Sequence, residues 1–229
     1  MVINDNNIPD VSIINYGINN LKSVSMAFFK IGKTYKIIEE PKDILSAKSL
    51  ILPGIGAFRD GMEGLRRRKL IEPIKQKVND GTPILGICLG MQMLFTESEE
   101  FGLYEGLNLI AGRVIPFKHP NEVNIKGYKV PQMGWNELNK PRDELKNTDS
   151  VWNCTLLSEI KEKSDVFFVH SFYPVPEAKA NILASTIYGN QEFCSVVKKD
   201  NVNGTQFHPE KSGNVGLQIL KNFCEIYEI

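Results

Sequence analysis

The chain has 229 residues, and 42% of them are hydrophobic, which is enough for one domain with a sizeable core. Its 27 basic and 27 acidic residues give no net charge, which argues against nucleic acid or an anionic membrane as a general partner. No apolar run approaches the roughly 20 residues that cross a membrane, and the polar stretch Met1 to Asp10 is typical of a flexible or peripheral extension, not of a signal peptide. We therefore expect a cytoplasmic protein that binds neither membranes nor nucleic acid.

The first half of the chain alternates predicted strands with predicted helices. In chain order, the patterns predict a strand at 11–16, a helix at 21–31, strands at 35–39 and 49–53, a helical region at 59–79 that Pro73 breaks or kinks, and a strand at 82–88. Such alternation favours a parallel sheet covered by helices on both faces.

The second half changes to short, often alternating segments. Strands are predicted at 112–117, 129–138, 165–173, 182–188, 193–198 and 202–207, with turns at 120–121, 141–142, 189–190 and 200–201 and a closing helix at 215–227. The predicted fold class is α/β, with an open, mixed, mainly parallel sheet, helices on both faces and added antiparallel strands in the second half. No repeat or long linker divides the sequence, so we expect residues 1–229 to form a single domain.

Cys88 lies between two glycines, where an apolar strand is followed by a helical pattern over 89–95. The segment reads Gly86-Ile87-Cys88-Leu89-Gly90-Met91-Gln92. A sharp bend needs glycine on both sides, because a side chain there would collide with the backbone of the neighbouring strand or helix. The bend pushes the sulfur out of the sheet, and the free N–H groups of the helix start favour a thiolate and a developing oxyanion. The segment therefore predicts a nucleophile elbow.

A cysteine nucleophile needs a base, and His208 is the best candidate for it. It lies in an extended-looking segment, Gly204-Thr205-Gln206-Phe207-His208-Pro209-Glu210, in which residues two apart point to the same face. Glu210 is then placed to accept the imidazole N–H while the other ring nitrogen faces the thiol. The predicted triad is Cys88, His208 and Glu210.

Each motif alone is weak, because free cysteine is among the most often buried residue types. Together, the glycine bracket, the strand-to-helix context and the His-Pro-Glu segment favour catalysis over a structural role. The other cysteines, Cys154, Cys194 and Cys224, are widely separated, so neither a zinc site nor a disulfide framework is predicted.

The loop Pro53-Gly54-Ile55-Gly56 follows the carboxyl end of another predicted strand. Ligands of open α/β sheets bind outside these ends, so we expect this loop to face the sulfur of Cys88. Its glycines let the backbone approach a ligand closely, or flip so that an N–H group turns inward. With such a flip, the oxyanion hole would be complete in only one conformation of the loop.

These motifs together resemble the class I (triad) glutamine amidotransferases. Within them, the segments 53–58, 129–136 and 168–171 are similar to the glutaminase subunits of imidazole glycerol phosphate synthase, the HisH family. The resemblance extends from Asn15 to the last predicted helix. It implies the flavodoxin-like fold of the class I glutaminases.

The resemblance also implies roles for further residues. The oxyanion donors would be the region of Ile55 and Gly56 together with Leu89, and the substrate-binding residues would be Gly54, Gln92, Glu100 and Ser171. Positions at or near the partner interface would be Asn20, Met133, Gly134, Trp135, Asn136 and Lys211.

The activity implied is hydrolysis of L-glutamine to glutamate and ammonia, without a metal or an organic cofactor. Ammonia would pass to a HisF-like (β/α)8-barrel cyclase, bound as a heterodimer, that forms imidazole glycerol phosphate and an aminoimidazole carboxamide nucleotide in histidine biosynthesis. Two alternatives stay open. A similar paralogue would supply ammonia for amidation of a nucleotide-linked sugar in surface polysaccharide synthesis, and a stand-alone cysteine hydrolase would need no partner. A non-catalytic protein would be expected to lack a triad member, and all three residues are present.

Overall fold

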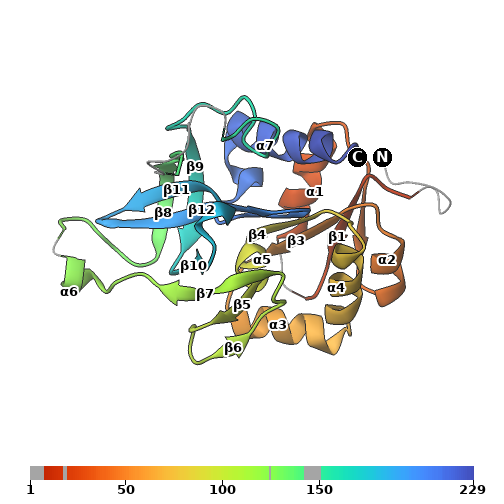
Figure 1. Ribbon diagram of the computed structural model, residues 1–229, viewed down its shortest axis with the longest axis horizontal. Coiled ribbons are helices and arrows are strands. Elements are labelled where there is room, and N and C mark those ends of the chain that lie inside the picture. Colours follow the sequence, from red (N-terminus) through yellow and green to blue (C-terminus); the bar gives the residue numbers. More distant parts are fainter. Residues whose placement is uncertain (1–7, 18–19, 124, 142–150) are drawn as a thin grey trace.

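A computed structural model describes residues 8–17, 20–123, 125–141 and 151–229 (Figure 1). Its largest sheet has the strand order β11-β12-β13-β4-β3-β1-β2. The parallel strands are β1 (Val11–Ile14), β2 (Tyr35–Ile38), β3 (Leu50–Gly54), β4 (Ile84–Cys88) and β13 (Val202–Thr205). The antiparallel strands β12 (Gln191–Lys199) and β11 (Ile182–Tyr188) extend one edge. The order of the parallel strands is the doubly wound, flavodoxin-like one, so the predicted fold class is confirmed.

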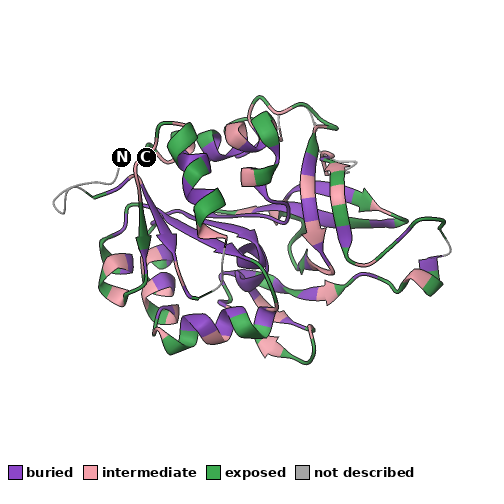
Figure 2. Ribbon diagram, turned by 180° about the vertical axis from the view of Figure 1, so that it is seen from behind, coloured by how far each residue is buried: buried purple, intermediate pink, exposed green. Residues whose placement is uncertain are grey.

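Helices cover both faces of this sheet. On one face lie α1 (Leu21–Lys30) and α7 (Gly213–Ile226), and on the other α3 (Phe58–Arg67), α4 (Ile71–Asn79) and the short α5 (Leu89–Met93), with α2 (Pro41–Ser46) packed against α4 (Figure 1). Successive strand residues point to opposite faces, so Leu50 and Leu52 join one apolar cluster and Ile51 joins the other. Figure 2 shows the resulting buried strands between partly exposed helices.

Two smaller sheets complete the described fold. One has the order β10-β7-β5-β6, and β8 pairs with β9 in the other. The bounds are β5 (Phe95–Ser98), β6 (Tyr104–Glu105), β7 (Ile110–Pro116), β8 (Gln132–Glu137), β9 (Asp165–His170) and β10 (Phe172–Pro176). The remaining elements are α6 (Pro120–Val123) and two 3-10 turns, Lys179–Asn181 and Pro209–Lys211.

Some element boundaries differ from the prediction. The helical region at 59–79 breaks before α4, where Lys69 has a φ of 57°, while Pro73 lies in the first turn of α4 and breaks nothing. Its missing N–H would have no partner in that turn anyway. The helix after Cys88 ends at Met93, because the chain then enters β5, and the predicted strand at 165–173 divides into β9 and β10 at Ser171. The turn predicted at 120–121 opens α6, and residue 142 of the turn predicted at 141–142 is outside the described residues.

Candidate active site

Cys88 is the last residue of β4 and directly precedes α5. Its backbone has φ 55° and ψ −109°, a conformation that a residue with a side chain rarely adopts. A Cβ on Gly86 would lie 2.7 Å from the carbonyl oxygen of Gly90, and a Cβ on Gly90 would lie 1.7 Å from the carbonyl oxygen of Leu52. The predicted steric need for both glycines is therefore confirmed, and the bend holds the sulfur at the carboxyl end of the central strand.

His208 reaches the same edge because β13 is the hydrogen-bonded neighbour of β4. Its Nδ1 lies 2.8 Å from Oε1 of Glu210, and neither side chain is exposed. The prediction that the segment is extended as far as Glu210 is wrong, since Pro209–Lys211 forms a 3-10 turn. Pro209 starts that turn with its fixed φ, and the turn still brings the carboxylate to the imidazole.

The thiol of Cys88 and the imidazole of His208 interact electrostatically in the site. Burial alone would lower the pKa of His208, but attraction to the Cys88 thiolate and hydrogen bonding with Cys88 and Glu210 outweigh burial, so the pKa of His208 is raised above its ordinary value. Its Nε2 is buried without a conventional hydrogen-bond partner among the described residues. This arrangement leaves Nε2 available to exchange a proton with Cys88.

Two residues support the triad in ways that the sequence reading missed. Asn20, expected only near the partner interface, donates from Nδ2 to Oε1 of Glu210 at 2.6 Å. The buried Gln206 directs its Nε2 toward Sγ of Cys88 at 3.8 Å. Gln206 lies two residues before His208, so strand alternation was the signal that could have found it. No local signal points to Asn20, because the contact joins distant parts of the chain.

A cavity of about 260 Å³ opens over the sulfur. Eight residues of the predicted site line it, namely Ile55, Gly56, Cys88, Leu89, Gln92, Glu100, Ser171 and His208, and Pro131, Val169, His170 and Phe172 complete its wall. Glu210 and Gly54 do not line it, but Glu210 bonds His208 and Gly54 pairs with Cys88. The nucleophile, the base and most of the predicted substrate residues thus meet around one small volume.

The carbonyl oxygen of Phe172 fixes two side chains of the cavity wall. It accepts from Nε2 of Gln92 at 2.9 Å and lies 2.8 Å from Nδ1 of His170, which therefore carries the proton. Burial and, to a smaller extent, nearby His208 lower the pKa of His170 to about 4, although the Phe172 hydrogen bond opposes them. His170 is thus a neutral buried histidine, and as one of only three histidines it could have been singled out from the sequence.

Glu100 and the loop 53–56 contribute to the cavity lining as well, the loop through Ile55 and Gly56. The half-buried Glu100 carboxylate accepts from the backbone N–H of Phe58 at 2.6 Å, at the start of α3. Burial raises the pKa of Glu100, and the Phe58 hydrogen bond opposes this. Gly56 has a φ of 97° with open space where a Cβ would lie, and Ile55 is 37% exposed. The loop therefore has room to change its backbone conformation beside the sulfur.

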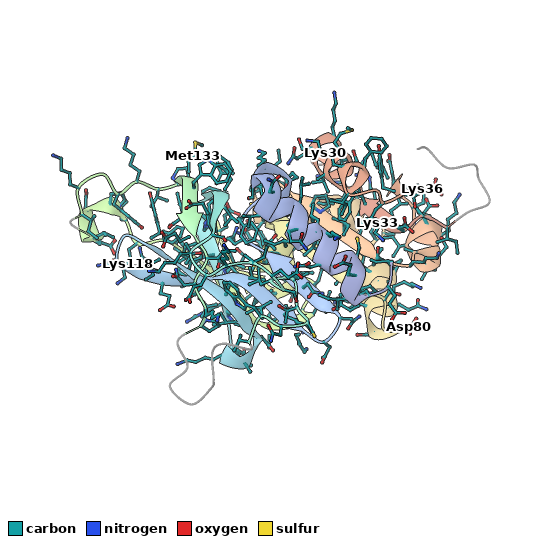
Figure 3. The ribbon with its side chains drawn as sticks, turned by 90° about the horizontal axis from the view of Figure 1, so that it is seen from above. Lys30, Lys33, Lys36, Asp80, Lys118 and Met133 are labelled. Carbon is teal, nitrogen blue, oxygen red and sulfur yellow. The ribbon has the colours of Figure 1, made fainter. Side chains whose placement is uncertain are left out.

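The predicted interface residues divide between β8, which carries Met133 to Asn136, and the triad, where Asn20 bonds Glu210. Met133 is 69% exposed and Trp135 is 57% exposed, and Figure 3 shows Met133 at the molecular surface. The Trp135 ring packs 5.9 Å from that of Phe167, over which Lys211 lies at 6.0 Å. Asn136 instead donates from its side chain to the carbonyl of Ile187 at 2.9 Å. Large exposed apolar side chains on one sheet face are typical of a protein interface.

The described residues offer no obvious place for a metal, since they contain no group of three or more His, Cys, Asp or Glu side chains close enough to ligate one. Nor is any helix in the described ranges long and apolar enough to cross a membrane.

Comparison with protein families matches residues 12–226 to the class I glutamine amidotransferases. The chain belongs to this family. Its relatives include the imidazole glycerol phosphate synthase subunit HisH of Geobacter metallireducens, 46% identical over 93% of this chain and 97% of that protein. HisH of a Geobacillus species is 47% identical over 95% of this chain and 97% of its own. Within the glutamine amidotransferases, the chain is thus a member of the HisH branch.

Solved structures share the amidotransferase fold at lower sequence identity. A crystal structure described as a glutamine amidotransferase has a TM-score of 0.68 at 17% identity and covers 96% of this chain and 99% of its own. PurLQS from Thermotoga maritima has a TM-score of 0.61 at 21% identity and covers 94% and 97%. At these identities the similarity supports the fold alone.

Proposed function

We propose that this chain hydrolyses L-glutamine with Cys88 as nucleophile, His208 as general base and acid, and Glu210 as the group that orients His208. The observation that carries the proposal is the placement of Cys88 at a strained elbow beside the buried His208–Glu210 pair, at the floor of one small cavity. Membership of the amidotransferase family supports the same reaction.

In the first half of the reaction, Nε2 of His208 takes the thiol proton, and the sulfur then attacks the side-chain amide carbon of glutamine. The carbonyl π electrons move onto oxygen, and the oxyanion is held by the N–H of Leu89 and one from the Ile55–Gly56 region. His208 then gives its proton to the amide nitrogen as the C–N bond breaks, so ammonia leaves and a glutamyl thioester remains.

In the second half, His208 takes a proton from water as that water attacks the thioester carbon. The C–S bond breaks, the thiolate leaves and glutamate is released. Glu210 stabilises the imidazolium in both halves, because its carboxylate accepts a hydrogen bond from Nδ1–H of His208. We assign contacts with the amino-acid part of glutamine to Gln92, Glu100 and Ser171, and Glu100 supplies the negative charge for the substrate ammonium.

The ammonia is proposed to go to a HisF-like (β/α)8 cyclase that binds this chain as a heterodimer in the cytoplasm, where a reactive thiol stays reduced. The printed name of the relatives, imidazole glycerol phosphate synthase subunit HisH, supports this acceptor. We place the contact at the exposed face of Met133 and Trp135. The paralogue that serves a nucleotide-linked sugar, and the stand-alone hydrolase, have no comparable support.

The test is glutamate release from glutamine by the chain with and without the cyclase, together with formation of imidazole glycerol phosphate. Coupled synthesis with the cyclase supports the full proposal. Hydrolysis that needs a different synthase would keep the glutaminase assignment but replace the acceptor. Failure of the complex to release glutamate would refute the function.

A further inference from the structure

The loop that carries the proposed oxyanion donor is held at both ends by side chains. At its start, the hydroxyl of Tyr16 donates to the carbonyl oxygen of Pro53 at 2.7 Å. At its end, Glu100 accepts from the N–H of Phe58 at 2.6 Å. Between these points, Gly54 still pairs with Cys88, and the carbonyl of Ala57 accepts from the N–H of Gly61 at 3.0 Å, so a conformational change of the loop is confined to Ile55 and Gly56.

Tyr16 is itself fixed from several sides. It is 1% exposed, and its carbonyl oxygen accepts from Nη1 of Arg68 at 3.0 Å. A Cβ on Gly64 would lie 2.4 Å from that carbonyl oxygen, and a Cβ on Gly54 would lie 2.4 Å from the Tyr16 hydroxyl. Because the backbone around the ring is this close, the hydroxyl has little freedom to leave Pro53.

The held carbonyl belongs to Pro53, the strand residue directly before the one that pairs with Cys88. Pro53 lies opposite Ile87, and Gly54 lies opposite Cys88, in the parallel register of β3 and β4. Rotation of the peptide that joins Pro53 to Gly54 would move everything downstream relative to the sulfur. The Tyr16 hydrogen bond opposes this rotation, whereas Gly56, with its φ of 97° and open surroundings, stays free to turn.

We propose that Tyr16 is a positioning residue for the reaction: by holding the carbonyl of Pro53, it sets the fixed end from which the oxyanion donor is presented to the tetrahedral intermediate. The proposal rests on the proposed function. Tyr16 does not line the cavity, so it acts through the loop and not by contact with substrate. Burial, and secondarily the charge of Cys88, raise the pKa of the Tyr16 hydroxyl, so it remains a proton donor throughout the working pH range.

The experiment compares Tyr16→Phe with wild type, each as the complex with the cyclase. Phenylalanine keeps the buried ring and removes only the hydroxyl. The matched control is Tyr227→Phe, which removes a hydroxyl that also donates to a backbone carbonyl, that of Asp200, away from the site. Removing a whole oxyanion donor costs about 10²–10³ in kcat, so displacing one is expected to lower kcat about tenfold at nearly unchanged KM.

Two further measurements separate positioning from general stability. Glutamate γ-semialdehyde forms a hemithioacetal whose oxygen occupies the oxyanion position, so its inhibition constant should rise by a factor similar to the fall in kcat. Alkylation of Cys88 by iodoacetamide needs no oxyanion donor, so its rate and pH dependence should match those of wild type. Tyr227→Phe should leave kcat and the inhibition constant unchanged.

Wild-type kcat in Tyr16→Phe would overturn the positioning role and leave the glutaminase function intact. Equal losses in turnover and in Cys88 alkylation would also overturn it, because they would show general damage to the site. Inability of the wild-type complex to hydrolyse glutamine would refute the function and, with it, this inference.

Discussion

The substitution Glu210→Gln tests the triad most sharply, because the structure predicts that it removes charge and little else. Oε1 of Glu210 accepts from Asn20 at 2.6 Å and lies 2.8 Å from Nδ1 of His208, while Oε2 is buried without a partner. A glutamine side chain can keep its oxygen at the Oε1 position and place its NH2 group where Oε2 lies. His208 then keeps the tautomer with the proton on Nδ1, and only the negative charge beside it is lost.

The size of the effect follows from the distance between the charges. Two unit charges about 4 Å apart interact by about 4 kcal/mol at an effective dielectric constant of about 20. His208 is neutral once ammonia has left with its proton, and it becomes an imidazolium again in the transition state of thioester hydrolysis, so this energy affects kcat. Since about 1.4 kcal/mol corresponds to tenfold, we expect kcat to fall by about 10²–10³, with KM nearly unchanged.

The assay is steady-state glutamate release by the complex with the cyclase, over a range of glutamine concentrations and pH. Loss of the carboxylate should also lower the pKa of His208, since Glu210 helps to raise it. The control is Glu225→Gln, which removes a carboxylate paired with Lys221 on the outer part of α7. A large rise in KM at unchanged kcat would make Glu210 a substrate ligand, and wild-type kinetics would remove it from the triad.

Three further predictions concern the nucleophile, a buried histidine and the partner face. Cys88→Ala should abolish glutamine-dependent synthesis but leave ammonia-dependent synthesis by the cyclase intact, and a diazo-oxo-norleucine probe should label Cys88 alone among the four cysteines, as peptide mass spectrometry would report. The pKa of His170 is about 4 in the folded chain and 6.5 ordinarily, so the unfolded chain binds more protons between these pH values. The free energy of unfolding, measured with urea, should therefore fall by about 3 kcal/mol from pH 6.5 to pH 4, and His170→Gln should lack this fall. An equal slope in the variant would contradict the assignment. The isolated chain should turn over glutamine slowly until the cyclase binds, and a Trp135→Ala variant that still binds the cyclase but stays slow would place the coupling at β8, whereas fast turnover without a partner would rule out gating.

The sequence alone determined the features that depend on near neighbours. The alternation of strand and helix patterns predicted a parallel sheet with helices on both faces, and the glycines around Cys88 predicted the elbow, because the steric conflict that Gly86 avoids is with Gly90 and Met91, only a few residues on. The pairing of His208 with Glu210 also needed only a separation of two residues. Relations between residues this close along the chain can be read from the sequence itself.

The tertiary structure decided what lies around those features. Strand order placed β13 beside β4, and only that order brings His208 to Cys88. The hydrogen bond from Asn20 to Glu210 spans 190 positions of the chain, and that from Tyr16 to Pro53 spans 37. The length of α5 was likewise set by the need to enter β5, although the apolar pattern continues past Met93. Local periodicity records which face of an element is apolar, but partners this distant are fixed only when the elements pack, so no spacing in the sequence could have revealed them.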